Sequence, residues 1–312
     1  MKKLSIFLVG GLMSLPMAQQ ASAITIQLDY SYDANHFFDS AAKKSVLSAA
    51  AHYFETRLND QLGAIQSLGS NQFTAQFSNP ATGATNSISN FNVAANTLKV
   101  FAGGRDLSGS TVGQGGPGGY DISGQSSFFK EAISRGQGDG TVSAVSGAGA
   151  KDFAPWGGSI TFATNTNWYF DDNVSTVESF SGNDFYSVAL HELGHLLGFG
   201  TADSWDNLVS GTDFVGPESS SVYGDPNSNP VPLSADKSHW LNGTQSLVDA
   251  VTQQEAAMDP SLTTGTRKYF TDLDLAALKD IGWEVSAVPV PAAIYLFATA
   301  LMGFGLMRRK TV

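Results

Sequence analysis

The sequence of 312 residues contains no cysteine. Disulfides, thiolate metal sites and cysteine nucleophiles are therefore excluded, and a bound metal would need histidine, carboxylate or carbonyl ligands. Basic residues are also scarce, with 17 Lys and Arg against 28 Asp and Glu. Five of the 17 lie at the two ends, which leaves 12 basic against 28 acidic residues over 24–286, a net charge of −16. This charge disfavours a nucleic-acid partner.

Charged residues of either sign make up only 14% of the chain, whereas hydrophobic residues make up 42% and aromatic residues 11%. The chain also has 33 glycines. This composition argues against a coiled coil, because long solvated helices need many charged residues. It predicts a loop-rich globular protein that contains strands.

The N-terminal segment has the three parts of a secretory signal peptide. A basic start at Lys2 and Lys3 precedes an apolar run over residues 4–18, and Ala21-Ser22-Ala23 supplies the small residues of a cleavage site. We therefore predict a signal peptide over residues 1–23 and a mature chain that begins at Ile24 outside the cytoplasm.

The C-terminal segment, residues 286–312, has a second pattern. Val288-Pro289-Val290-Pro291-Ala292 precedes an apolar stretch over 292–307, which ends at Arg308-Arg309-Lys310. At ~1.5 Å per residue the stretch spans roughly 24 Å, short of the ~30 Å hydrocarbon core. The segment resembles a PEP-CTERM sorting tail in its Val-Pro-x-Pro-Ala form.

The resemblance of this tail implies an exosortase-like sorting enzyme as a partner, transient insertion of the tail in the inner membrane, and release at the surface of a Gram-negative bacterium or outside it. A plain transmembrane helix that anchors the protein is the alternative. An intact C-terminus at Val312 in the exported protein would contradict processing and favour the anchor.

The region between these ends, residues 24–285, is predicted to form one domain. Period-two alternation and apolar runs predict strands, and apolar residues at three- and four-residue steps predict helices. The segment 103–124 contains many glycines and one proline, and it is predicted to be a mobile surface loop. It is not predicted to bind phosphate, because no Gly-Lys-Ser/Thr sequence ends it. The predicted strands are 24–30, 98–101 and 159–163, and the predicted helices are 39–62 with Asp39 as its N-cap, 126–134 and 271–283.

The most informative stretch lies at about residues 183–198, which are predicted to form a helix. His191 and His195 are four residues apart, so their side chains lie on one helix face and can occupy adjacent corners of a zinc site. Glu192 lies about 100° round the helix from His191. Its carboxylate is placed to take a proton from a water on the same metal rather than to be a ligand.

This stretch resembles the metzincin metalloproteases, whose pattern is His-Glu-x-x-His-x-x-Gly-x-x-His. Gly198 matches the glycine that ends the helix, a position that suits positive φ. Thr201 stands where the third histidine of the family is expected. The sequence therefore departs from the pattern at the third zinc ligand.

Two residues compete for the role of third ligand. His239 precedes Met258-Asp259-Pro260, which resembles the Met-x-Pro turn of metzincins, and leishmanolysin-like members share a displaced third histidine followed by such a turn. Asp203 would instead be a carboxylate ligand, as in aspzincins. We favour His239, which requires residues 202–238 to be an insertion that loops out and returns. His36 and His52 are interpreted as ordinary surface or core histidines.

The resemblance implies an α/β metzincin-like zincin fold: a twisted mixed sheet, two long helices and a loop-rich C-terminal subdomain. It implies a secreted or surface endopeptidase that acts on protein or peptide substrates, with one catalytic Zn²⁺ on His191, His195 and His239 and with Glu192 as general base. Met258 would form an apolar floor.

In the order of elements, strand 159–163 corresponds to the edge strand that binds a peptide by β-addition. Ca²⁺ at Asp171-Asp172 or at Asp272 and Asp274 is possible, but solvated loop acids and helix caps are favoured there. The alternative to an enzyme is a non-catalytic matrix or binding protein.

Overall fold

The computed structural model describes residues 24–286 apart from 172, 175, 177, 225 and 226. The predicted signal peptide and almost all of the predicted sorting tail lie outside the described residues. Within the part of the chain that is described, no helix is both long and apolar enough to cross a membrane.

A mixed sheet of four strands forms the centre of the fold, in the order β1-β4-β7-β5. Strands β1 (Thr25–Asp29), β4 (Thr97–Arg105) and β7 (Gly157–Ala163) are parallel, and β5 (Gly113–Pro117) is antiparallel to β7. All seven residues of β7 are buried, as expected for a strand covered on both faces and paired on both sides. The twisted mixed sheet that the sequence predicts is confirmed.

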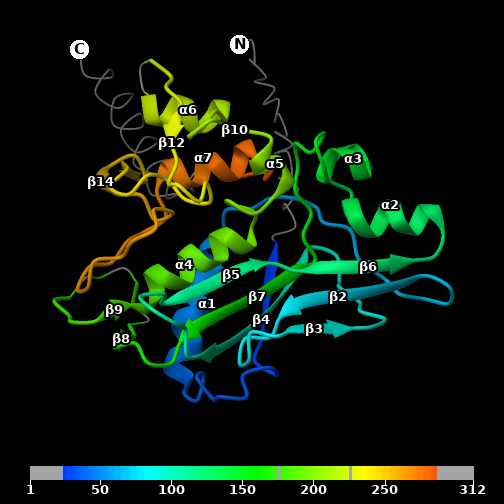
Figure 1. The fold of residues 1–312 in the computed structure, drawn as a ribbon, viewed down its shortest axis with the longest axis horizontal. Helices are drawn as coiled ribbons and strands as arrows, with labels where there is room; N and C mark the ends of the chain where they lie inside the picture. Colours follow the sequence, from blue (N-terminus) through cyan, green and yellow to red (C-terminus); the bar gives the residue numbers. More distant parts are fainter. Residues whose placement is uncertain (1–23, 172, 175, 177, 225–226, 287–312) are drawn as a thin grey trace, which may run out of the picture.

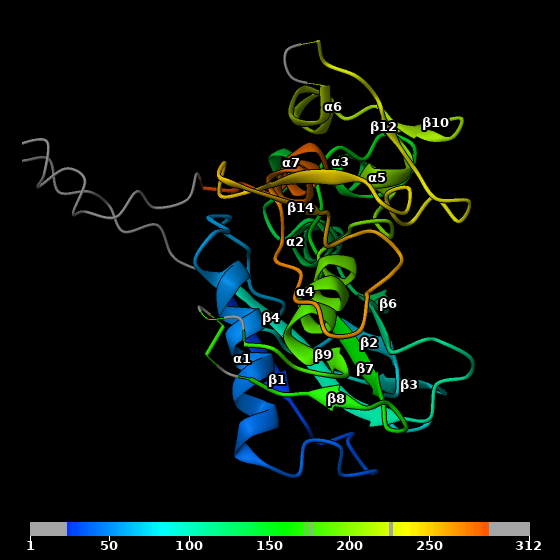
Figure 2. The same cartoon turned by 90° about the vertical axis from the view of Figure 1, so that its left-hand side faces the viewer.

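Two long helices cover one face of this sheet and lie side by side (Figure 2). They are α1 (Ala41–Glu55) and α4 (Phe185–Leu196). The other face is covered by a second sheet of β2 (Gln72–Ser78), β3 (Thr85–Ile88) and β6 (Gly119–Ser123). Successive residues of β4 therefore enter different cores: Val100 joins the helical core, whereas Phe101 packs with Phe77 and Trp156.

Short elements and loops form the C-terminal part of the fold, which lies above α4 in Figure 1. The last helix, α7 (Asp272–Asp280), begins after the N-cap Thr271, and Thr271 and Asp274 form a reciprocal capping box. This arrangement confirms the expected α/β class with a loop-rich C-terminal part. The remaining elements are α2 (Ser126–Ser134), a 3-10 turn (Gly138–Gly140), α3 (Val142–Val145), β8 (Trp168–Tyr169), β9 (Asn183–Asp184), α5 (Asp203–Asp206), β10 (Val209–Ser210), β11 (Asp213–Phe214), α6 (Pro217–Gly224), β12 (Val231–Pro232), β13 (Gln245–Val248), β14 (Thr252–Glu255) and α7 (Asp272–Asp280).

Two predictions about the sheet were wrong. Strand 159–163 is not the edge strand, because β5 pairs with its outer side. The segment 103–124 is not a mobile loop, because it contains the end of β4 and all of β5 and β6. Its glycines allow close approach instead: a Cβ at Gly113 or Gly115 would overlap Glu192 of α4. The edge of the sheet thus lies directly against the predicted catalytic helix.

The first helix also differs from its prediction. Ser40 rather than Asp39 is the N-cap, since its hydroxyl accepts a hydrogen bond from Lys43 N. The helix ends at Glu55, and the following residues bend away so that Leu58 pairs with Val285 near the end of the described chain. Helix 126–134 agrees with its predicted bounds.

Candidate metal centre and active site

Helix α4 is held at its N-terminus by a buried ionic network. The carboxylate of its N-cap, Asp184, accepts hydrogen bonds from Ser187 N (3.1 Å) and Ser187 Oγ (2.6 Å). The guanidinium of Arg267 donates to both oxygens of the same carboxylate, at 3.0 and 2.8 Å, and also to Asp171. Both Asp184 and Arg267 are buried. The network fixes the start of the helix that carries the histidine pair.

The helix ends as the sequence predicts, at a glycine with positive φ. Gly198 has φ +102°, and Leu197 is the C-cap. Gly194, within the helix, permits a second close approach, because a Cβ there would lie 2.6 Å from the sulfur of Met258. Met258 is fully buried against this side of α4, which is the floor position that the Met-turn resemblance implies.

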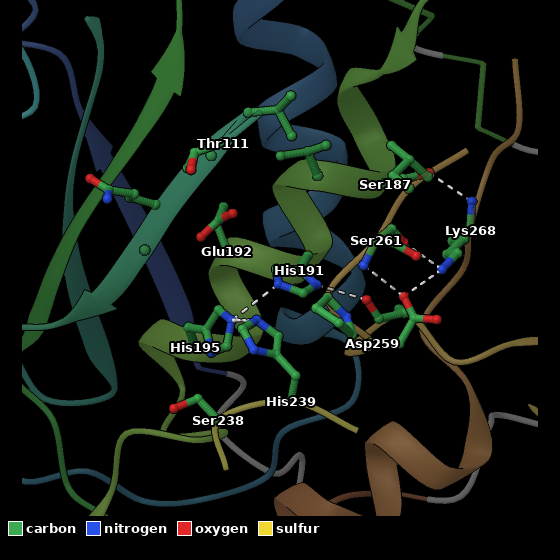
Figure 3. Close-up of a pocket in the computed structure, with 18 of the residues that line it drawn as sticks. Thr111, Ser187, His191, Glu192, His195, Ser238, His239, Asp259, Ser261 and Lys268 are labelled. Carbon is green, nitrogen blue, oxygen red and sulfur yellow. Dashed lines mark hydrogen bonds and ion pairs between the residues drawn. The ribbon is translucent and has the colours of Figure 1, made fainter. Parts of the chain in front are cut away.

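Three histidine side chains converge beside the helix (Figure 3). The Nε2 atom of His195 lies 3.1 Å from Nε2 of His191 and 3.1 Å from Nε2 of His239. The ligand atoms of the three residues all lie within 4.8 Å of one another. Ligands at two corners of a tetrahedral zinc site, with Zn–N of ~2.0–2.1 Å, are separated by about 3.3 Å. The three imidazoles therefore have the spacing of a zinc ligand set.

The opposite nitrogen of each ring has a hydrogen-bond acceptor that orients it. His191 Nδ1 lies 2.7 Å from the carbonyl oxygen of Ala257, and His195 Nδ1 lies 2.9 Å from that of Phe199. His239 Nδ1 lies 3.0 Å from a carboxylate oxygen of Asp236. A carbonyl oxygen only accepts, so Nδ1 carries the hydrogen and the lone pair of Nε2 is directed at the common point.

The electrostatic environment keeps two of these rings neutral. Burial lowers the pKa of His191 well below its ordinary value, and the neighbouring His195 and His239 lower it further. Burial, with a contribution from His239, lowers the pKa of His195 to about 4. Metal binding requires the unprotonated imidazole. The donor chemistry of the site therefore fits a zinc ion.

Glu192 lies between α4 and the edge strand β5, on the wall of the same cavity (Figure 3). Burial raises the pKa of Glu192 to about 8, while the backbone N–H of Gly115 donates to its carboxylate and opposes the rise. The cavity has a volume of about 560 Å³ and is lined by all three histidines as well as by Glu192. A buried carboxyl group thus shares one cavity with the metal ligand set.

The structure separates the two candidates for the third ligand. Asp203 points away from the histidines, and its carboxylate accepts hydrogen bonds from Gly147 N (2.6 Å) and Ser146 Oγ (3.2 Å). Thr201, at the position of the missing histidine, donates its hydroxyl hydrogen to the carbonyl oxygen of His195 (2.7 Å). His239 is brought to His195 across 44 residues of sequence.

The comparison with known families adds independent information on this helix. Residues 128–212 match the family model of the matrixins. The match covers 85 of the 312 residues and includes His191, Glu192 and His195, but it ends before His239. It supports a zinc-dependent metalloendopeptidase of the metzincin type. No curated protein and no solved structure was found to match the chain.

Asp274, which the sequence suggested only as a helix cap or a calcium ligand, has a further role in supporting the site. It is fully buried, and it links α7 to the two segments that complete the site. Its Oδ1 accepts from Trp240 Nε1 (2.9 Å) and Met258 N (3.2 Å), and its Oδ2 accepts from Ala257 N (2.9 Å). The sequence could not show this role, because the partners lie 16 to 34 residues away.

The other acidic and histidine candidates lie elsewhere. Asp171 contacts Arg267, and Asp272 accepts from the backbone N–H of Ala250. His36 and His52 are exposed on the first part of the chain, outside the cavity. Asp172 lies outside the described residues.

The cavity also extends beyond His191 to a buried ionic group. The ammonium of Lys268 lies 2.7 Å from Asp259, 2.7 Å from Glu255 and 2.6 Å from the carbonyl oxygen of Ser261. Figure 3 shows Lys268, Asp259 and Ser261 on the opposite side of His191 from Glu192. These contacts hold the segment after Met258 in place as the far wall of the cavity.

Proposed function

We propose that this chain is a zinc-dependent endopeptidase whose ligands are His191, His195 and His239, the last displaced from the usual metzincin position. The observation that carries the proposal is the convergence of three Nε2 atoms in the cavity that also contains the Glu192 carboxylate. A purely structural zinc site needs no proton acceptor and has no open cavity.

Each residue has a distinct role in this mechanism. Zinc held by the three histidines would supply a Lewis acid that polarises the scissile carbonyl and lowers the pKa of water. Glu192 would accept a proton from the attacking water at its carboxylate and pass it to the nitrogen of the leaving amine. A cation beside this carboxylate favours its charged form, which offsets the effect of burial on its pKa.

The edge strand β5 supports binding of an extended peptide. Its inner side pairs with β7, and no other described strand pairs with its outer side. Gly113 and Gly115 place this strand next to Glu192. A peptide that adds to the free edge as an antiparallel strand would therefore lie across the metal ligands with its backbone held by main-chain hydrogen bonds.

The test combines zinc content with hydrolysis of casein. Glu192→Ala should keep zinc and lose hydrolysis by about 10²-fold or more, since it removes a proton acceptor and no ligand. His239→Ala should lose zinc, whereas Asp203→Ala should retain it, because Asp203 points away from the ligand set.

Two outcomes would contradict the proposal. A zinc-loaded wild-type protein without hydrolytic activity would indicate a binding or matrix protein. Loss of zinc from Asp203→Ala with retention in His239→Ala would move the site to the aspartate-liganded class.

A further inference from the structure

A second cavity of about 370 Å³ adjoins the proposed active site beyond the C-terminal end of α4. Thr201 lines both cavities, and β5 contributes Gly113 to Gly115 to the first and Pro117 to the second. Most of the walls of the second cavity come from segments that supply no metal ligand: β2, α2, α3, the turn at Gly118 that leads from β5 into β6, and residues 153–156.

Aromatic and aliphatic side chains form much of the lining of the second cavity, beside polar groups at Ser146, Thr201 and Asp203. Trp156, which is buried, is fixed by a hydrogen bond from its Nε1 to the carbonyl oxygen of Gly119 (2.9 Å). Tyr120 stacks on Phe73 with ring centroids 5.3 Å apart, and 37% of Tyr120 remains exposed. Val145 of α3 adds an aliphatic wall. Such a cavity favours a large apolar or aromatic side chain.

The cavity is also held open by a frame of hydrogen bonds. Asp203 at its rim accepts from Gly147 N and Ser146 Oγ, which ties the loop after α3 to α5. Asn207 strengthens the same link by donating to the carbonyl oxygens of Gly147 (3.0 Å) and Ala150 (2.9 Å). A cavity that is formed before its ligand arrives loses less entropy on binding.

The edge strand connects the two cavities. Gly115 of β5 lies at Glu192, and Gly118 to Tyr120, three to five residues further along, line the second cavity. At ~3.3 Å per residue an extended chain places these positions up to about 10–17 Å from Gly115. A peptide antiparallel to β5 has its N-terminal part at this end, because β5 runs from Gly113 toward Pro117.

We propose that the second cavity is a specificity site for the substrate: it binds a large apolar side chain three to five residues before the scissile bond. The inference rests on the proposed endopeptidase function. It adds that selectivity is set in part by residues of β2, α2 and α3, well away from the metal ligands.

The experiment measures kcat/KM for three synthetic peptides based on one casein bond that the full-length, zinc-loaded protein cleaves. The first peptide carries Phe at the third to fifth positions before the bond, the second carries Ala there, and the third is shortened so that these positions are missing. Wild-type protein should prefer the Phe peptide to the Ala peptide by roughly tenfold or more.

Two variants and one control test the assignment to this cavity. Tyr120→Ala removes an aromatic wall, and Ser146→Trp places a bulky ring at an exposed position of the lining. Each should bring the Phe-to-Ala ratio close to one while hydrolysis of the shortened peptide is unchanged. Tyr223→Ala is the matched control, because Tyr223 is also a partly exposed tyrosine (39%) but lies on α6 outside both cavities. It should retain the wild-type ratio. Ser146→Trp keeps the test valid if Tyr120→Ala does not fold.

The contrary results are distinguishable. Equal cleavage of the Phe and Ala peptides by the wild-type protein, or an equal loss on all three peptides in both variants, would overturn the specificity site and leave the endopeptidase function intact. Failure to cleave any peptide would refute the function itself, and the site with it.

Discussion

Replacement of Asp274 by asparagine should weaken both the fold and the metal site. The carboxylate accepts two hydrogen bonds at Oδ1, from Trp240 and Met258, and three at Oδ2, from Ala257 N, Thr271 N and Thr271 Oγ1. An amide has only one acceptor oxygen. In either orientation of the asparagine side chain, its NH₂ group therefore faces at least two of these donors. All of these hydrogen bonds are buried.

The size of the effect follows from these contacts. A buried donor without a partner costs about 1–3 kcal/mol, so two of them cost about 4 kcal/mol. Burial raises the pKa of Asp274, which means that the folded state already carries a desolvation penalty for the charge. Removing the charge recovers part of it. We therefore expect a net loss of about 3 kcal/mol, a large share of the ~5–15 kcal/mol of a typical domain.

Urea denaturation of the metal-free protein measures this loss, and a zinc titration measures the effect on the site. Asp274 accepts a hydrogen bond from Trp240, the residue after His239, so its replacement should lower zinc affinity by about 10- to 100-fold. Asp272→Asn is the matched control on the same helix, since Asp272 accepts one hydrogen bond, from Ala250 N. Its free energy of unfolding should change by less than about 1 kcal/mol. An Asp274→Asn protein with wild-type stability and zinc affinity would refute the reasoning.

Two further predictions concern other parts of the fold. Gly115→Ala should lower thermal stability and activity, because the new Cβ would overlap the backbone of Glu192, whereas Gly116→Ala should leave the melting temperature unchanged, because its Cβ would meet nothing within 4 Å; equal melting temperatures would contradict the close packing. Burial raises the pKa of Asp60 to about 7, although the hydrogen bond from the backbone N–H of Glu284 opposes the rise. Asp60 then loses its proton at a lower pH in the unfolded chain than in the folded one. The free energy of unfolding should therefore fall as the pH rises from about 4 to 7. Asp60→Asn, a neutral replacement, should gain roughly 2 kcal/mol over wild type at pH 8 and little at pH 4, as urea unfolding at the two pH values would show; an equal gain at both would exclude titration of Asp60.

Local signals predicted the helices of the site well. The helix of His191 and His195 was predicted from the spacing of the histidine pair and from the resemblance to the metzincin pattern. It ends at Gly198, where glycine suited the positive φ that is found. Helix α2 was also predicted with its correct bounds. Both depend on interactions within a few residues, which a single sequence displays.

Contacts across the chain could not be predicted in the same way. Strand β5 has the sequence Gly-Gln-Gly-Gly-Pro, which has no hydrophobic alternation, and its place at the edge depends on β7 and on the approach of α4. The role of Asp274 depends on partners from two distant segments. His239 could be nominated from its order relative to Met258, but its position beside His195 required the folded chain.

The distance in sequence between His195 and His239 has a consequence for folding. An ion shared by the two residues closes a loop of 44 residues and joins α4 to the C-terminal part through a single point. Cross-links over such loops act mainly by restricting the unfolded chain. A bound metal ion would therefore act as a cross-link between α4 and the C-terminal part of the fold. With the ion chelated, amide hydrogen exchange should rise first in the segments around His239 and Met258, while the central sheet retains its protection.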